Sequence, residues 1–420
     1  PLAAMFRSDP SATRATQKSQ KQTMLRVALA VWAAVALEPP PRFDLDLAKP
    51  PQNRWDGAVS LILARHSFEH SFLPVFREHN ATLFDKLTAE QFTSIASAVD
   101  QHWPEAAEEL RGIAAQLAPF SVTFEYLAAW LYFHELAHTD AAAVNPRECT
   151  GIVTQAGDGS ILHAANMDQN PPAARNLTLR IRTVDASGKV VFEGVDWYTL
   201  LSTGVSRAVR KGLASVQENW RTTQTRTLDE VLSDIQAGVI SQMLVFRRAF
   251  QGAHHAQGQG RTWTFQDFVS NVTNTQLAAP FYVVAAGTKP GEGVAVARNL
   301  IGADRADWLQ FQDDFFLCQC NTDRWVPDNP QDPRRTAAED LLSKFGREES
   351  ASMLGLFAIS SAYPVHNPAT AYTALMSAET GEFHTYVREA SCPLDPYASA
   401  VVDRRYCMKG SSPSPGILLQ

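Results

Sequence analysis

Apolar positions recur with a helical period in the first third of the chain. From residue 83 to residue 140 they stand three and four positions apart, as on one face of a helix. The segment 104–117 opens with Pro104, and proline is favoured at the first position of a helix. The segment 124–137 is apolar along almost its whole length. These patterns predict a helical unit, preceded by an extended, proline-rich segment at 39–57.

After residue 148 the pattern changes to short apolar runs separated by turn residues such as Gly157-Asp158-Gly159, which is typical of strands. Two sets of these runs are separated and followed by segments with helical spacing. This order predicts an α+β fold in which stacked sheets are covered by helices. The expected strands are 149–156, 161–165, 177–184, 190–195, 281–286, 294–298, 371–378 and 383–388, and the expected helices are 228–250, 265–272, 336–345 and 350–360.

Composition argues against nucleic-acid binding, and the N-terminal sequence indicates export through the secretory pathway. Of 420 residues, 45% are hydrophobic, and the net charge of −7 argues against the basic surface of a nucleic-acid-binding protein. Residues 1–23 are polar, and we expect them to be disordered or an extension from the gene model. Met24, Arg26 and an apolar run with Ala34-Val35-Ala36 have the layout of a secretory signal peptide over 24–36. A buried N-terminal helix is the alternative.

Glycosylation sequons and cysteines add mild support for secretion. The three N-x-S/T sequons are at Asn80, Asn176 and Asn271. All five cysteines lie at or after Cys149, and one catalytic thiol plus four others suits an oxidising compartment. Cys392 and Cys407 are candidate partners. Cys318 and Cys320 are expected to point to the same face of a strand.

A thiol and a carboxylate stand one predicted hairpin apart. Cys149 opens a strand-like run, and Asp168 ends the segment His163–Asp168 nineteen residues later. This arrangement fits a nucleophile that becomes a chain terminus, with its freed α-amine as the base and the carboxylate holding that amine. The polar linker at 145–148 breaks the helical pattern and is expected to be exposed. The chain is therefore predicted to be a zymogen that cuts itself between Glu148 and Cys149.

A competing motif lies just before that linker. His134-Glu135-Leu136-Ala137-His138 matches H-E-x-x-H, in which two histidines on one helical face bind Zn²⁺ and the glutamate acts as base. A catalytic site needs a third protein ligand, and none of the remaining histidines has a spacing that supplies one. We therefore favour an amphipathic helix with a polar stripe and predict neither a metal nor a cofactor, while a zinc protease remains an alternative.

Several segments in order along the chain resemble one enzyme family. They are 43–55, 109–115, 149–153, 163–168, 281–298, 321–336 and 370–388, of which 321–325 and 332–336 are the most specific. In these segments the chain is similar to the acid ceramidase and N-acylethanolamine-hydrolysing acid amidase family of lysosomal N-terminal-nucleophile hydrolases. The resemblance implies a four-layer αββα sandwich. It also implies a helical α-subunit at 37–148 and a catalytic β-subunit at 149–420, which form a heterodimer from one self-cleaved precursor.

The resemblance also implies a role for five residues. Cys149 would attack the substrate amide, and Asp168 would accept hydrogen bonds from its α-amine. Asn321 would donate an N–H to the oxyanion. Arg334 would orient the nucleophile region or the acyl carbonyl. Glu218 would take part in self-cleavage and in the hydrogen-bond network of the site.

One departure from the family concerns position 165. The family has an arginine there, two residues after the histidine of H-x-x-N-x-D, whereas this chain has Ala165. A methyl group cannot position a nucleophile or stabilise negative charge. Gln169 or Arg175 could substitute, and otherwise activity would be weak or absent. Residues 1–148 also contain no cysteine, so packing of the 124–137 helix would have to hold the two subunits together.

The sequence thus predicts a lysosomal or secreted lipid amidase that cuts an N-acylsphingosine (ceramide) or an N-acylethanolamine. Its acyl channel would expose apolar surface to a membrane or to a lipid-presenting protein. Three alternatives remain: an inactive lipid-binding protein, because of Ala165; the zinc protease; and an amidase for bile-salt-like or penicillin-like amides.

Overall fold

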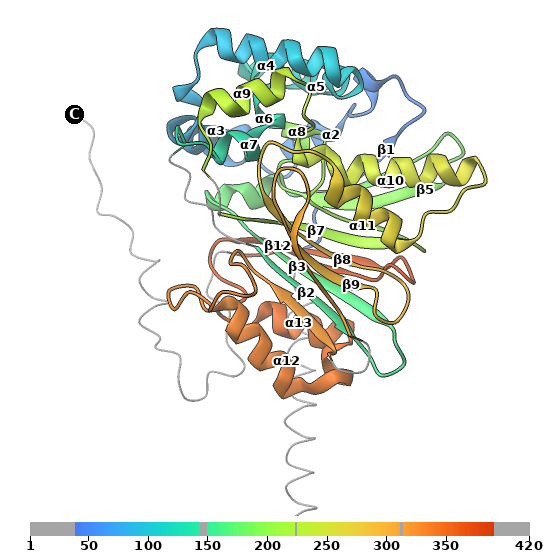
Figure 1. The fold of residues 1–420 in the computed structure, drawn as a ribbon. Coiled ribbons are helices and arrows are strands. Elements are labelled where there is room, and N and C mark those ends of the chain that lie inside the picture. The colour runs from blue at the N-terminus through green and yellow to red at the C-terminus, as the bar shows by residue number, and fades with distance from the viewer. Residues whose placement is uncertain (1–37, 143–148, 223–224, 311–313, 390–420) are drawn as a thin grey trace, which may run out of the picture.

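The structure is a computed structural model that describes residues 38–142, 149–222, 225–310 and 314–389. The expected extension at 1–23, the signal peptide at 24–36, the linker at 145–148 and the pair Cys392 and Cys407 lie outside the described residues. Figure 1 shows two stacked sheets between helices at either end of the molecule. Within the described ranges, no helix is both long enough and apolar enough to cross a bilayer.

The first part of the chain is the helical unit. Its helices are α2 (Ala58–Leu63), α3 (Phe72–Thr82), α4 (Ala89–His102), α5 (Pro104–Leu117), α6 (Phe124–Leu131) and α7 (Phe133–Ala137), with short 3-10 turns at Pro51–Asn53, Phe68–His70, Phe84–Lys86 and Ala118–Phe120. Helix α5 has the predicted bounds. The single helix expected over 124–137 is wrong, because Tyr132 interrupts it with non-helical angles (φ −101°, ψ 20°). The Tyr132 hydroxyl donates to Val239 O at 2.8 Å, and this buried hydrogen bond anchors the break.

The described residues form two sheets. The larger has eight strands in the order β1-β4-β5-β6-β7-β8-β9-β10, and the smaller has five in the order β11-β2-β3-β12-β13. Neighbouring strands are antiparallel except β1 and β4, which are parallel. The strands are β1 (Arg42–Asp46), β2 (Thr150–Gln155), β3 (Ile161–Asp168), β4 (Leu179–Val184), β5 (Val190–Asp196), β6 (Arg207–Arg210), β7 (Ala214–Trp220), β8 (Phe281–Ala286), β9 (Gly293–Arg298), β10 (Ala303–Trp308), β11 (Phe316–Gln319), β12 (Thr370–Met376) and β13 (Phe383–Val387).

Helices cover the outer face of each sheet, and the inner faces meet. Strands β2 and β3 face β7 and β8, while the larger sheet is covered on its outer side by α10 and α11. Helices α12 and α13 cover the outer side of the smaller sheet. The αββα order that was expected from the resemblance is confirmed. The remaining helices are α8 (Thr199–Ser202), α9 (Leu228–Gln236), α10 (Gln242–Gly258), α11 (Phe265–Asn274), α12 (Arg334–Ser350) and α13 (Met353–Ser361), with a 3-10 segment at Pro172–Leu177.

The two faces of the smaller sheet belong to different apolar cores. Cys149, Ala165 and Met167 lie in the core between the sheets. The core against α12 and α13 contains alternate residues of the same strands, among them Ile152 and Ala164. Since successive side chains of a strand point to opposite faces, this division orients the whole β2–β3 hairpin. Cys318 and Cys320 both lie in the second core, as expected of residues on one face.

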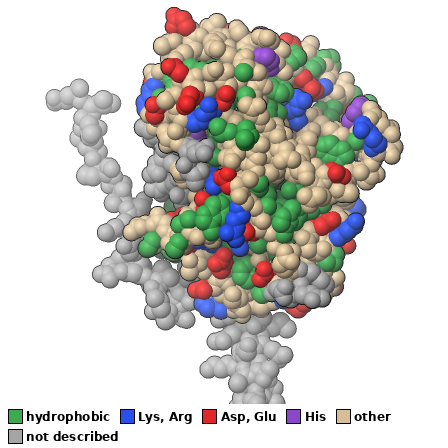
Figure 2. Space-filling view, in the orientation of Figure 1, with side chains coloured by type: hydrophobic (Ala, Val, Ile, Leu, Met, Phe, Trp, Pro, Cys, Tyr) green, Lys and Arg blue, Asp and Glu red, His purple; other side chains and the backbone are tan. Residues whose placement is uncertain are grey.

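Charged side chains of both signs are mixed over the surface, and a few apolar side chains are exposed among them (Figure 2). The large apolar residues of the described chain that are more than a third exposed are Leu61, Val190, Ile301, Trp325 and Val326. Trp325 and Val326 lie in the segment that joins β11 to α12. This segment therefore presents a small apolar surface next to the residues that begin α12.

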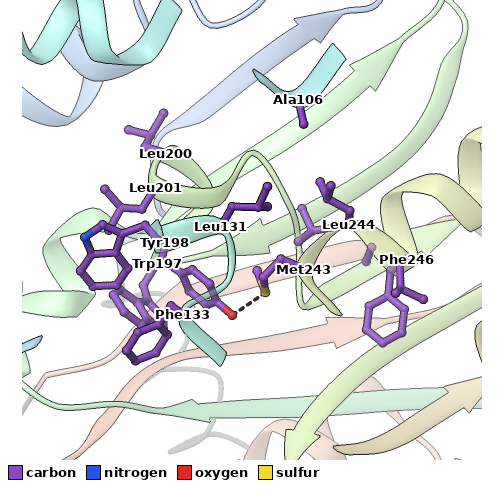
Figure 3. Packing of buried hydrophobic residues seen from close by; sticks show 14 of the residues in the cluster. Ala106, Leu131, Phe133, Trp197, Tyr198, Leu200, Leu201, Met243, Leu244 and Phe246 are labelled. Carbon is purple, nitrogen blue, oxygen red and sulfur yellow. Dashed lines mark hydrogen bonds between the residues drawn. The ribbon is translucent and has the colours of Figure 1, made fainter. Parts of the chain in front are cut away.

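The helical unit packs into the rest of the molecule through buried apolar residues (Figure 3). Leu131 of α6 and Phe133 of α7 belong to the same core as Trp197 and Tyr198, which precede α8, and Met243 of α10. The rings of Phe133 and Trp197 meet edge to face, with centroids 6.3 Å apart. The contact between the two parts is thus apolar and aromatic at this place, which is the kind of packing expected of the 124–137 segment.

One further prediction of secondary structure is corrected, and some strands were missed. The helix expected over 228–250 is two helices, because Gly238 has a left-handed backbone (φ 80°) and Ser241 caps α10 by accepting from Met243 N at 3.2 Å. Strands β6 and β7 were not predicted. Their buried positions include Arg207 and Glu218, so the apolar alternation that marks a strand is absent there.

Candidate active site

The β2–β3 hairpin places Cys149 beside the end of β3. Pairing of Thr150 with Asn166 and of Gly151 with Ala165 brings Cys149 opposite Met167, whose Sδ lies 3.5 Å from Cys149 Sγ. The Cys149 side chain faces the core between the sheets, and the residue is only 4% exposed. The nucleophile proposed from sequence is therefore buried where the two sheets meet.

Asp168 ends β3 and accepts three hydrogen bonds. Asn367 Nδ2 donates to Oδ2 at 2.6 Å, Thr370 Oγ1 donates to Oδ1 at 2.6 Å, and Arg334 NH1 lies 3.1 Å from Oδ2. Burial raises the pKa of Asp168, although these three donors favour the carboxylate. The structure thus brings Asp168 together with Arg334, as expected, and adds Asn367 and Thr370. Thr370 stands in one of the segments that carry the family resemblance, whereas no pattern in the sequence pointed to Asn367.

Arg334, the first residue of α12, connects the groups of the site. Besides Asp168 it donates to both oxygens of Asp332, at 2.6 and 2.7 Å, and to Asn321 Oδ1 at 3.2 Å. Its NH1 also lies 3.4 Å from Thr150 Oγ1, next to Cys149 in the chain. One guanidinium therefore links the start of β2, the end of β3 and the segment after β11.

Asn321 lies close to this cluster, and one of the two N–H groups of its side-chain amide is engaged. Nδ2 donates to Trp220 O at 2.8 Å, while Oδ1 faces Arg334. Asn321 is positioned by β11, which pairs with β2. The carboxamide nitrogen carries a second N–H, so Asn321 could donate to an oxyanion while it stays bonded to the last residue of β7.

Glu218 faces the helical unit and not Asp168. Its Oε1 lies 3.5 Å from His134 Nε2 of α7, and its Oε2 lies 3.7 Å from Arg207 NH1 of β6. All three side chains are buried. The structure thus divides the expected site residues into two groups: Asp168, Asn321 and Arg334 on one side of Cys149, and Glu218 toward α7.

The three polar side chains of the H-E-x-x-H segment contact other residues of the protein. His134 meets Glu218, and the His138 ring stacks on Trp220 with centroids 3.8 Å apart. Glu135 accepts from Gln242 N at 2.6 Å, and burial raises its pKa. Among the residues that the structure describes, no group of three or more His, Cys, Asp and Glu side chains is placed to hold a metal ion.

The two residues considered as substitutes for an arginine at position 165 are engaged elsewhere. Arg175 NH2 donates to Pro368 O at 3.0 Å, and Gln169 Nε2 donates to Asn170 O at 2.8 Å. Sequence reasoning also did not single out Arg207, which is fully buried. The signal that could have revealed it was a charged residue within the mostly apolar stretch Val205-Ser206-Arg207-Ala208-Val209.

Burial raises the pKa of the Cys149 thiol to about 12, and Arg207 acts in the opposite direction. The backbone of Asp168 also hydrogen-bonds the sulfur and favours the thiolate. In the single-chain form the thiol is thus neutral near pH 7. Nucleophilic attack by such a thiol needs a base within reach and a group that stabilises negative charge.

Similarity to known proteins extends over most of this chain. No family model matches it. It is 25% identical to an N-acylethanolamine-hydrolyzing acid amidase of Caenorhabditis elegans over 84% of this chain and 93% of that protein. It is 25% identical to an acid ceramidase of Balaenoptera acutorostrata scammoni, over 84% of this chain and 87% of that one. A solved structure of the C. elegans amidase orthologue is similar with a TM-score of 0.48 at 25% identity, covering 57% of this chain and all of that chain.

Proposed function

We propose that this chain, a homologue of N-acylethanolamine-hydrolysing acid amidases and acid ceramidases, hydrolyses the amide bond of an N-acyl lipid with Cys149 as an N-terminal nucleophile. Its substrate would be ceramide, giving sphingosine and a fatty acid, or an N-acylethanolamine. The observation that carries the proposal is the position of Cys149 at the start of β2, beside the hydrogen-bonded Asp168, Arg334 and Asn321.

Activation would use the same thiol. Cys149 Sγ attacks the carbonyl carbon of Glu148, the peptide C–N bond breaks, and the nitrogen leaves as the α-amine of Cys149. Water then hydrolyses the thioester and frees the Glu148 carboxylate. The product would carry its own base, the neutral α-amine, next to the nucleophile. Asp168, which Asn367 and Thr370 hold, would accept a hydrogen bond from that amine.

Turnover follows the same order of steps. The α-amine takes the thiol proton, and sulfur attacks the substrate carbonyl. The proton then passes to the leaving amine of the lipid, and water hydrolyses the acyl-enzyme to the fatty acid. Asn321 would give the oxyanion the Nδ2 N–H that is not bonded to Trp220 O, while Arg334 holds Asn321 Oδ1 and Asp168.

Several features fit an N-acyl lipid and an acidic compartment of the secretory pathway. Trp325 and Val326 are exposed between Asn321 and Arg334, where a lipid surface or a lipid-presenting protein could meet the site. The two pieces of a cleaved chain would remain together, since Phe133 and its neighbours are buried against Trp197 and Tyr198 (Figure 3). We therefore propose an α/β heterodimer in the lysosome or outside the cell.

The test is intact mass spectrometry of the secreted chain before and after incubation at acid pH, followed by assays on ceramide and on an N-acylethanolamine. We expect cleavage between Glu148 and Cys149 and hydrolysis by the cleaved form only. Cys149→Ala should stay intact, and cleavage of this variant at the same bond would assign the cut to another protease. A wild type that stays whole but co-purifies with lipid would favour the second candidate, an inactive lipid-binding protein. The observation behind this candidate is Ala165, which stands where the family has an arginine.

A further inference from the structure

Three small residues stand side by side on the inner face of the smaller sheet. Ala165 of β3 pairs with Gly151 of β2 on one side and with Ala374 of β12 on the other. A Cβ added to Gly151 would lie 2.8 Å from the Gln217 side chain, so this row faces the larger sheet closely. The row leaves room for one long side chain from the opposite sheet.

The register of the larger sheet identifies that side chain. In β5, β6 and β7, Val195 pairs with Arg207 and Arg207 pairs with Gln217. Gln217 lies over Gly151 of β2, and the hydroxyl of Tyr372, on β12, donates to Val195 O at 3.2 Å. Arg207, between Gln217 and Val195, therefore lies over β3, which carries Ala165 and Met167. Directly paired residues share a face of the sheet, so Arg207 points inward as Gln217 does.

The Arg207 guanidinium is only partly satisfied. NH1 donates to Ser206 Oγ and lies 3.7 Å from Glu218 Oε2. Nε and NH2 have no hydrogen-bond partner among the described residues, although the side chain is 0% exposed. A buried charge with unused donors is costly unless a further acceptor arrives. Cys149 lies within electrostatic reach of this guanidinium, and Arg207 favours its thiolate.

We propose that Arg207 is the positioning residue of the nucleophile: its free N–H groups, reaching across from β6 over Ala165, stabilise the negative charge that forms at Cys149 Sγ and on the carbonyl it attacks. The inference rests on the proposed function. It makes the alanine at position 165 a requirement of the site, because a second guanidinium on β3 would occupy the same space. The charge that the chain lacks on β3 is thus present on β6.

The test follows the ionisation of the thiol through its reactivity. Alkylation of Cys149 by iodoacetamide is followed against pH by peptide mass in wild type and in Arg207→Gln, Arg207→Lys and Arg210→Gln. We expect Arg207→Gln to move the Cys149 curve up by roughly one pH unit or more and Arg207→Lys to move it less. Arg210, on the same strand, is bound to Val191 O and Gln257, so its variant should leave the curve unchanged. An unchanged curve in folded Arg207→Gln overturns the proposal.

A swap of the guanidinium provides a second, independent variant. Ala165→Arg alone should lose activity, because two guanidinium groups compete for one space. The double variant Ala165→Arg, Arg207→Ala should recover self-cleavage and lipid hydrolysis above the level of Arg207→Ala. A folded double variant no more active than Arg207→Ala contradicts the assignment. A wild type without cleavage or hydrolysis would refute the proposed function, whereas the alkylation curves, which need no substrate, would still decide the role of Arg207.

Discussion

His134 Nε2 of the helical unit lies 3.5 Å from Glu218 Oε1 in the centre of the larger sheet. The two residues came from competing hypotheses, one for a metal site and one for an N-terminal nucleophile, and they meet in one buried contact. Because Glu218 Oε2 also lies 3.7 Å from Arg207, the contact connects α7 to the guanidinium beside Cys149. Removal of the helical unit would therefore alter the electrostatics of the nucleophile.

Loss of the Glu218 carboxylate should destabilise the chain. Glu218→Ala leaves Arg207 buried without a nearby anion other than Asp196, and breaking a buried ion pair costs about 3–5 kcal/mol. Urea unfolding of the Cys149→Ala precursor with and without Glu218→Ala measures the free energy of unfolding. Glu193→Ala serves as the control, because Glu193 of β5 forms a partly exposed ion pair with Arg180 of the adjacent strand β4. Equal losses in both variants would show that Arg207 does not depend on Glu218.

Asn321→Ala should lower kcat by roughly 10²–10³ with little change in KM, since an oxyanion donor acts mainly on the transition state. Asn299→Ala removes an amide of similar size from a surface turn and should leave both constants unchanged. Steady-state kinetics of the cleaved enzyme provide the measurement. Full activity of Asn321→Ala would mean that the oxyanion is bound by another donor.

Asp196 should make the precursor more stable in acid. Burial raises the pKa of Asp196 to about 6, although Arg207 and the donors of Ser206 and Trp197 favour the carboxylate. The folded state thus holds this proton more tightly than the unfolded chain. The resulting stability is fully present below the unfolded pKa of about 4 and is lost as the pH rises through 6, by about 2–3 kcal/mol.

The measurement for Asp196 is the free energy of unfolding between pH 4 and pH 7 for the Cys149→Ala precursor, with and without Asp196→Asn. The difference between the two proteins should fall with rising pH in that interval. A difference that stays flat over this interval would contradict the raised pKa.

The helical unit should be held by one buried carboxylate as much as by apolar packing. The Glu109 carboxylate of α5 accepts two hydrogen bonds from the guanidinium of Arg247 in α10, at 2.5 and 2.6 Å. It accepts a third from Arg54 NH1 at 2.9 Å. Burial alone would raise the pKa of Glu109, but Arg247 and Arg54 hold it below its usual value. Glu109→Ala leaves the buried guanidinium groups of Arg247 and Arg54 without this carboxylate. We expect a loss of about 3–5 kcal/mol in the free energy of unfolding.

The control for Glu109 is its neighbour Glu108, which pairs with Arg111 at 3.1 Å in a half-exposed position. Glu108→Ala should cost less than about 1 kcal/mol. After self-cleavage, size-exclusion chromatography should show the two pieces separating in Glu109→Ala and staying together in Glu108→Ala. Separation in neither variant would show that the Glu109 ion pairs do not decide the association, and separation in both would show that the effect is not specific to Glu109.

The sequence by itself determined what is local. A proline at a helix start and regular apolar spacing set the bounds of α5, and the Cys149–Asp168 hairpin followed from two strands and a turn within twenty residues. Only the tertiary structure decided which distant side chains complete the site. Asn367 and Thr370 reach Asp168 from about two hundred residues away, and Arg207 lies over Ala165 because two sheets stack. From the sequence alone, Ala165 indicates that a positive charge is missing. The sequence shows which residues are adjacent along a strand, but not which side chains face them from the other sheet.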